Sequence, residues 1–210
     1  MDSKMKLVFA SNNAHKLAEV RQIMPDGIEV LSLRQIGFNQ EIEETGLTLS
    51  ENSRIKAQTV TEWLKANNKW SFVDGVFADD TGLEIDVLDG APGVYTARWA
   101  EQESGVHLPE METYAANRAK ALRELKGKED RGCQFKTVIT LIRGEEESQV
   151  AGIVRGRITT EEQGRGGFGY DPIFVPEGYY LTFGQLPEKT KNSISHRARA
   201  LQALVNILDF

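Results

Sequence analysis

The chain has 210 residues, of which 40% are hydrophobic, with one cysteine and a formal net charge of −6. This length allows a sizeable core in a single domain, residues 1–210, and an acidic chain without basic clusters is not typical of proteins that coat DNA or RNA. Because the chain has no run of about 18 apolar residues and only Cys133 as a thiol, we expect a cytoplasmic protein without membrane or nucleic-acid partners.

The first half of the chain carries alternating strand and helix patterns. An apolar run at residues 6–10 predicts a buried strand, and apolar residues at helical spacing predict a helix over residues 14–24. The same spacing predicts a second helix over residues 49–66. Two further strands, at residues 76–80 and 83–88, are expected to follow it. This half therefore has the strand–helix–strand order of an α/β protein.

The second half begins with a predicted helix over residues 109–126, where Pro109 suits a first helical turn. Two longer β-patterned runs follow at residues 133–143 and 149–158, separated by a charged turn, as in an antiparallel pair. The last helix is expected to begin near Ser193. Together the elements predict a mixed α/β protein that folds as one unit with two lobes around a cleft.

The stretch "SNNAHK" at residues 11–16 lies between the first strand and the first helix. Free N–H groups at a helix N-terminus, together with the helix dipole, favour a bound anion. Ser11, Asn12 and Asn13 supply hydrogen-bond donors, and Lys16 adds a cation one turn into the helix. The alternative is a plain helix cap by Asn13. The stretch is not a Walker loop, because GxxxxGK[ST] is absent.

Two acidic groups lie further along the chain. Adjacent Glu43 and Glu44 precede the second helix, where they either supply oxygen ligands to a hard cation or form a solvated face with a capping box. Asp79 and Asp80 end an apolar strand, which is where ligands bind in α/β sheets. Neighbouring residues of a strand point to opposite faces, so we expect these two aspartates to have different roles.

The stretch "RGGFGYDPIF" at residues 165–174 surrounds Phe168 with glycines. Glycines allow unusual turns and the close approach of another surface, so Phe168 is suited to stacking on a flat ligand. The alternative is a β-turn that directs Phe168 into the core. Near the last helix, Lys191, His196 and Arg197 gather donors at a helix N-terminus, where cations are unfavourable unless they meet an anion or an acceptor-rich ring.

Taken together, these stretches resemble the inosine triphosphate pyrophosphatase family, which includes the dITP/XTP pyrophosphatases. The resemblance covers almost the whole chain in the family's order, with matches at residues 11–16, 43–46, 51–52, 78–98, 166–174 and 191–197. It implies an elongated mixed β-sheet flanked by helices, with two lobes around a central cleft, in a homodimer. It also implies Mg²⁺-dependent hydrolysis of non-standard purine nucleoside triphosphates, such as dITP, ITP and XTP, to the monophosphate and pyrophosphate.

The resemblance also implies roles for individual residues. The triphosphate would be cradled by the loop residues Ser11, Asn12, Asn13, Ala14, His15 and Lys16. Mg²⁺ would be held by Glu43, Glu44 and Asp80, and Asp80 would also accept a proton from the attacking water. Thr81 would contact substrate. The nucleotide, mostly around its base, would be contacted by Phe168, Gly169, Tyr170, Asp171, Lys191, His196 and Arg197.

Three positions depart from the family's pattern. Asn12 stands where Gly is frequent, Gly164 where Pro commonly occurs, and Ala151 where an acid is frequent. We expect these differences to change detail rather than the reaction. Two alternative functions remain: hydrolysis of another modified nucleotide on a related fold, and nucleotide binding without catalysis. The acidic residues argue against a pure binding module, since carboxylates placed near phosphates weaken binding unless a metal joins them.

Overall fold

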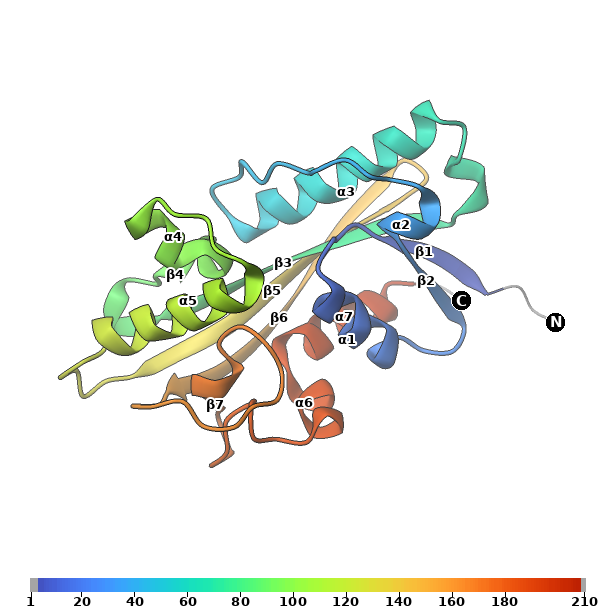
Figure 1. The fold of residues 1–210 in the computed structure, drawn as a ribbon. Helices are drawn as coiled ribbons and strands as arrows, with labels where there is room; N and C mark the ends of the chain where they lie inside the picture. Colours follow the sequence, from blue (N-terminus) through green and yellow to red (C-terminus); the bar gives the residue numbers. More distant parts are fainter. Residues whose placement is uncertain (1–3, 209–210) are drawn as a thin grey trace. The chain divides into compact units, whose positions relative to one another are not determined.

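The computed structural model describes residues 4–208 (Figure 1). The chain forms two compact units. The first contains the described residues up to Asp80, together with Thr137–Gly152 and the chain from Arg197 onward. The second contains Thr81–Lys136 and Ile153–His196. Within residues 4–208, no helix has both the length and the apolar character needed to cross a membrane.

Unit 1 begins with parallel strands and the helices that connect them. Strand β1 (Met5–Phe9) lies between β2 (Ile28–Ser32) and the first part of β3 (Gly75–Ile85), and all three run parallel. Parallel strands need crossover connections, and helices make them here. These connections contain α1 (Ala14–Ile23), α2 (Leu33–Ile36), α3 (Leu49–Ala66) and the short 3-10 turn η1 (Trp70–Phe72).

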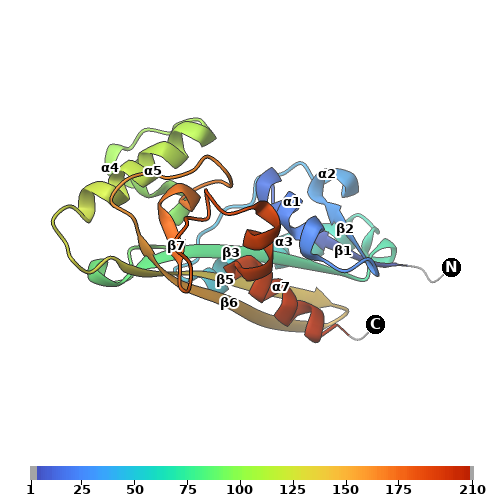
Figure 2. The same cartoon turned by 90° about the horizontal axis from the view of Figure 1, so that it is seen from below.

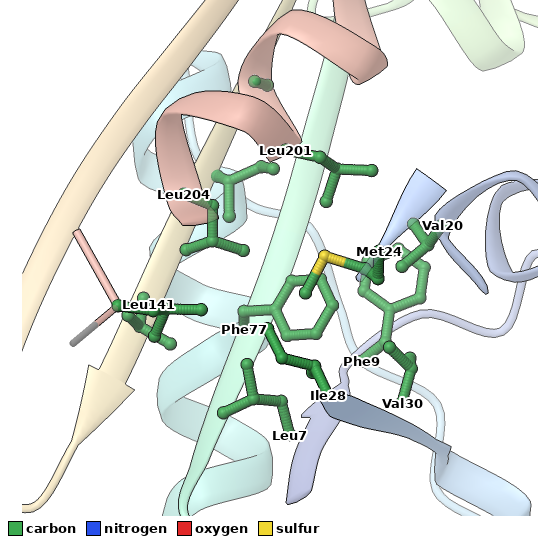
Figure 3. Close-up of a cluster of buried hydrophobic side chains, with 13 residues drawn as sticks. Leu7, Phe9, Val20, Met24, Ile28, Val30, Phe77, Leu141, Leu201 and Leu204 are labelled. Atoms are coloured by element: carbon green, nitrogen blue, oxygen red, sulfur yellow. The ribbon is translucent and has the colours of Figure 1, made fainter. Parts of the chain in front are cut away.

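Both faces of these strands are buried, because side chains alternate between the two faces. Leu7, Phe9 and Phe77 belong to a cluster that includes residues of α1 and of α7 (His196–Asn206), among them Leu201 (Figure 3). Val8, Ala10, Val76 and Ala78 belong to a second cluster, which contains Ala57, Val60 and Leu64 of α3. Figures 1 and 2 show α3 on one side of the strands and α1 with α7 on the other.

Unit 2 has a mostly antiparallel arrangement around its own core of Leu83, Phe135, Ile158, Phe174 and other buried residues. Strand β4 (Pro92–Gly93) pairs antiparallel with β3, and β7 (Phe174–Pro176) pairs antiparallel with β6 (Glu146–Ile158). The remaining elements are η2 (Asp86–Leu88), η3 (Thr96–Arg98), α4 (Trp99–Ser104), α5 (Glu110–Glu124), β5 (Gly132–Arg143), η4 (Asp171–Ile173) and α6 (Glu188–Ile194).

The order of hydrogen-bonded strands is β2-β1-β3-β5-β6-β7, with β4 beside β3. A mixed sheet flanked by helices is therefore confirmed as the fold class. Strands β3, β5 and β6 have residues in both units. The single domain, the elongated shape and the central cleft stay predictions.

Three sequence-based boundaries were wrong. The strands expected at residues 76–80 and 83–88 are one strand, β3, because β-branched Thr81 suits an extended chain and buried Gly82 continues it. Asp79 and Asp80 therefore lie within a strand rather than at its end, and residues 86–88 form the turn η2. The last helix is two helices, since the backbone at Ser195 is extended and ends α6 before α7 begins. Strand β6 begins at Glu146, three residues earlier than expected, because the turn between β5 and β6 needs only Gly144 and Glu145.

Candidate active site

The loop between β1 and α1 is fixed by its own polar side chains. The Asn13 side chain caps α1 by accepting a hydrogen bond from the Lys16 backbone N–H at 2.9 Å, and the Asn13 N–H donates to Ser11 Oγ at 3.2 Å. Asn12, Ala14 and His15 are exposed. Asn13 therefore serves as a helix cap, as the plainer alternative predicted, and the same cap sets the loop's shape at the N-terminus of α1.

Asp79 lies at the centre of a buried ion-pair network in unit 1. Its Oδ1 accepts from Lys16 Nζ at 2.9 Å, and its Oδ2 accepts from Arg197 Nε at 3.0 Å. Arg197 also pairs through Nη1 with Glu19 of α1. Asp79 is 1% exposed and Arg197 2%. The network joins β3 to α1 and α7 on one face of the strand.

The charges of this network depend on one another. Burial alone would raise the pKa of Asp79, but Lys16 and Arg197 outweigh it, and the pKa lies well below its ordinary value. For Arg197, burial works against the charged form, and Asp79 and Glu19 reverse the effect so that the pKa is raised. Burial lowers the pKa of Lys16, with Asp79 opposing the change. Asp79 is thus a fixed anion whose partners occupy both of its oxygens.

Asp80 meets a different set of groups. Its Oδ1 lies 3.4 Å from Nζ of Lys56 in α3, and the same ammonium donates to Glu44 Oε1 at 2.8 Å. Asp80 Oδ2 is buried and has no hydrogen-bond partner among the described residues. Burial raises the pKa of Asp80, although Lys56 acts in the opposite direction. Asp79 and Asp80 therefore contact helices on opposite faces of β3, as the alternation of a strand predicts.

The acidic loop, which precedes α3 and carries Glu43 and Glu44, places only one of these two side chains in the cluster around Lys56. Glu44 is half-buried against Lys56, whereas Glu43 is exposed. For Lys56, burial disfavours the ammonium, but Asp80 and Glu44 overcome this and raise its pKa. No group of three or more His, Cys, Asp or Glu side chains placed to hold a metal occurs within residues 4–208. Thr81 follows Asp80 in β3 and is half-buried.

A second predicted cluster lies in unit 2, around the glycine-rich loop. Asp171 Oδ2 accepts hydrogen bonds from the Phe168 N–H at 2.8 Å and from Lys191 Nζ at 2.6 Å. Gly167 and Gly169 have positive φ, at +70° and +60°. A Cβ added at Gly167 would overlap the Asp171 carboxylate, so glycine is required there for the loop to close on this aspartate.

Phe168 is half-buried, which matches neither a fully exposed ring nor a core residue. Lys191 Nζ lies 5.0 Å from the centre of its ring, and the Tyr114 ring lies 6.1 Å away. Arg118 of α5 holds the following residue by donating from Nη1 to the Gly169 carbonyl at 2.9 Å. The buried Tyr170 donates its hydroxyl to the Thr96 carbonyl at 3.0 Å. Helix α5 and Asp171 thus fix the loop that carries Phe168.

His196 and Arg197, predicted together at the base, have different surroundings in the structure. The His196 ring stacks on Phe135 at a centroid distance of 4.6 Å and is 5% exposed, within unit 2. Arg197 belongs to unit 1, where its guanidinium pairs with Asp79 and Glu19. Contacts of either residue with a base stay predictions.

Known proteins provide a direct comparison. The chain matches the Ham1 family over residues 7–207. A dITP/XTP pyrophosphatase of Flavobacterium johnsoniae is 43% identical over 204 residues, which cover 97% of this chain and 98% of that protein. The dITP/XTP pyrophosphatase of Bacillus subtilis is 44% identical over 206 residues, covering 96% of each chain. The chain belongs to the Ham1 family.

The fold agrees with this membership. A HAM1 protein from Coxiella burnetii has a similar structure, with a TM-score of 0.81, 33% sequence identity, and coverage of 97% of this chain and 98% of that one. The Staphylococcus aureus Ham1 protein gives a TM-score of 0.78 at 35% identity, covering 95% of each chain. The resemblance inferred from the motifs is therefore confirmed.

Sequence reasoning missed two charged residues that belong to these two clusters. Lys56 completes the cluster at Asp80, and Glu19 completes the network at Asp79. A signal for Lys56 was present, because Lys56 lies four residues before Val60, on the same buried face of the helix. A buried lysine on such a face requires an anionic partner. No comparable local pattern identifies Glu19.

Replacing Arg197 with Ala tests whether the network stabilises the fold. The change leaves Asp79 and Glu19 buried without their shared cation, so the free energy of unfolding should fall by about 3–5 kcal/mol. Arg199→Ala, at an exposed position of the same helix, is the control and should stay within about 0.5 kcal/mol of the unmodified protein. Urea denaturation measures both variants. Equal stability of the two variants would contradict the role assigned to Arg197.

Proposed function

We propose that this Ham1-family chain hydrolyses non-standard purine nucleoside triphosphates, namely dITP/ITP and XTP/dXTP, to the monophosphate and pyrophosphate. The observation that carries the proposal is the pair of adjacent aspartates, Asp79 and Asp80, in the strand beside the loop between β1 and α1 (residues 11–16, called the phosphate-type loop below). Asp79 is saturated by cations, while Asp80 keeps one buried oxygen without a partner among the described residues. The names of the relatives, dITP/XTP pyrophosphatases, support the substrate class.

The triphosphate is assigned to the loop at the start of α1. The loop supplies backbone N–H groups at a helix N-terminus, polar side chains and the Lys16 ammonium, which together suit an anion. Lys16 is held at 2.9 Å from Asp79, so its charge is positioned before substrate arrives. The six residues with this role are Ser11, Asn12, Asn13, Ala14, His15 and Lys16.

The carboxylates near Lys56 fit a magnesium ion. Mg²⁺ is usually held by one or two carboxylates together with substrate phosphates, so a cluster of three protein ligands is not required. Asp80 offers a buried oxygen without a partner among the described residues. Half-buried Glu44 pairs with the Lys56 ammonium, which also contacts Asp80. We assign Asp80 and Glu44 as the ligands, with Glu43 as an exposed neighbour. The bound cation supplies charge neutralisation for the phosphate oxygens.

Asp80 has the properties of the group that handles the attacking water. A triphosphate resists water because its anionic oxygens repel the nucleophile, and Lys16 and Lys56 reduce that repulsion. The Asp80 carboxylate accepts a hydrogen bond from the water and orients it toward phosphorus. Hydrolysis then releases pyrophosphate and the nucleoside monophosphate.

The base is assigned to the glycine-rich loop and its neighbours in unit 2. Phe168 offers a ring face for stacking, worth about 1–3 kcal/mol for a purine. Hypoxanthine and xanthine carry an acceptor oxygen at C6, where adenine carries an amino donor. Lys191, next to Phe168, and His196 supply donors toward such an oxygen. The same assignment includes Gly169, Tyr170 and Asp171. Arg197 is left out of it, because its guanidinium pairs with Asp79 and Glu19 in unit 1.

The resemblance and the composition also support a compartment and an oligomeric state for the enzyme. We assign it to the cytoplasm, because one buried cysteine suits a reducing compartment. Burial raises the pKa of Cys133 to about 12, so this thiol is inert and has no part in the reaction. The working form is taken to be a homodimer.

A product assay tests the proposed function. The protein with Mg²⁺ should release pyrophosphate rather than phosphate from ITP and XTP, with kcat/KM at least a hundredfold above that for ATP. The reason is that adenine places a donor against donors, at about 1–3 kcal/mol or more for each buried group left unsatisfied. Release of phosphate would indicate a phosphatase. Equal kcat/KM for ATP would contradict the assignment of the residues that contact the base. Binding without turnover would indicate a binding module.

Asp80→Asn tests the catalytic assignment. It keeps the shape of the side chain but removes a metal ligand and the group that orients water, so turnover should fall by about a thousandfold or more. Asp74→Asn, at the exposed residue before β3, is the control and should keep full turnover. Pyrophosphate release from ITP with Mg²⁺ measures both. A folded Asp80→Asn protein that keeps more than a tenth of the turnover would remove Asp80 from the mechanism.

Phe168→Ala tests the stacking role. Stacking is about equal in the ground state and the transition state, so KM for ITP should rise by about tenfold or more while kcat is roughly kept. Tyr180→Ala, at a 91% exposed ring in the same unit, should change neither constant. Steady-state kinetics with ITP provides both values. A hundredfold loss of kcat at unchanged KM would instead make Phe168 a scaffold residue.

A further inference from the structure

The acidic loop is fastened to the start of α3 by three consecutive backbone groups. The N–H of Gly46 donates to Asn52 Oδ1 at 2.8 Å. The N–H groups of Leu47 and Thr48 both donate to Glu51 Oε2, at 2.7 and 3.0 Å. Two neighbouring side chains of the helix therefore take every backbone donor at the end of this loop.

Helix capping explains Glu51 but not Asn52. Glu51 forms a capping box with Thr48, which needs no contribution from the next residue. Asn52 is completely buried, and its Nδ2 has no hydrogen-bond partner among the described residues. A buried donor without a partner destabilises a fold, so asparagine is a poor choice here if stability alone decides the residue. Its use at this position indicates a task connected with the loop.

The loop's approach to Asn52 is close enough to require glycine. A Cβ at Gly46 would lie 2.7 Å from Asn52 Oδ1 and 2.7 Å from Glu51 Cβ, which is closer than real Cβ contacts allow. Any larger residue at this position would push the loop away from the helix. Gly46 and Asn52 therefore act as a matched pair, one removing bulk and the other supplying the acceptor.

This pair lies next to the groups assigned to catalysis. Glu44 precedes Gly46 by two residues, so the Gly46–Asn52 hydrogen bond limits how far Glu44 can move. Asn52 and Lys56 are four residues apart and share one face of α3. Lys56 in turn contacts Glu44 at 2.8 Å and Asp80 at 3.4 Å. One helix face thus holds the loop at Asn52 and its carboxylate at Lys56.

We propose that Asn52 is a positioning residue for the hydrolysis, which holds Glu44 beside Asp80 by binding the Gly46 N–H. The inference rests on the proposed function and adds to it a residue that acts through the acidic loop rather than on the substrate. Loss of this hydrogen bond lets the loop move, so Glu44 no longer meets the cation in the geometry that Asp80 requires. Outer-shell groups of this kind typically change metal affinity or activity by 10–100-fold.

The test compares Asn52→Ala, Gly46→Ala and the double variant with Ser53→Ala as the matched control. Ser53 is the next residue of α3 and is equally buried, but its hydroxyl bonds to Thr140 at 2.7 Å, away from the loop. For each full-length protein, hydrogen exchange is measured in a peptide covering residues 43–48. The Mg²⁺ concentration for half-maximal pyrophosphate release is measured at saturating ITP.

Asn52→Ala and Gly46→Ala should each speed exchange in that peptide and raise the Mg²⁺ requirement by about tenfold or more. The double variant should be no worse than either single variant, because both remove the same contact. Ser53→Ala should leave the Mg²⁺ requirement unchanged. If Asn52→Ala does not fold, Gly46→Ala, outside the helix, carries the test alone.

The inference is overturned if the unmodified protein is active and the loop variants need no more Mg²⁺ than Ser53→Ala. Faster exchange with an unchanged Mg²⁺ requirement also overturns it, because Asn52 would then stabilise the loop without positioning Glu44. Failure of the proposed function would give a different result, because the unmodified protein would then release no pyrophosphate from ITP.

Discussion

The buried carboxylate of Asp79 is the constraint on which the rest of unit 1 depends. A charge taken out of water destabilises a fold by several kcal/mol unless it is paired and hydrogen-bonded. Asp79 meets that requirement with Lys16 from α1 and Arg197 from α7. Satisfying one aspartate therefore fixes where both helices begin relative to the middle of β3. The phosphate-type loop obtains its position from the same contacts, because it leads directly into α1.

The residue after Asp79 has the opposite character. Strand alternation directs Asp80 to the α3 face, where Lys56 is shared with Glu44 and one carboxylate oxygen stays without a partner among the described residues. Incomplete satisfaction of a buried group is unfavourable for stability, and proteins tolerate it mostly at functional sites. The two aspartates therefore differ in role: Asp79, whose two oxygens are both paired, stabilises the scaffold, and Asp80, with one unpaired oxygen among the described residues, is available for chemistry. Asn52, whose amide donor has no partner among the residues the structure describes, belongs to the second kind.

Much of the fold could be predicted from the sequence, because local periodicity determines it. The strand at residues 6–10 and the helices over residues 14–24 and 49–66 agree closely with β1, α1 and α3. Partners that are distant in sequence could not be predicted. Asp79 and Arg197 are 118 residues apart, and no local pattern says that the guanidinium is bound by an aspartate before any ligand arrives. The split of the last helix at Ser195 was likewise not visible, since its apolar spacing continues.

The free energies of unfolding of Asp79→Asn and Asp80→Asn, measured side by side in urea, test the division between the two aspartates most directly. Both changes replace one carboxylate with an amide of the same shape in adjacent residues of one strand. The account predicts that Asp79→Asn loses about 3 kcal/mol, because buried Arg197 and half-buried Lys16 lose their shared anion. It predicts that Asp80→Asn stays within about 1 kcal/mol of the unmodified protein, because Glu44 still pairs with Lys56. Equal losses in the two variants, or a larger loss at Asp80, would contradict it.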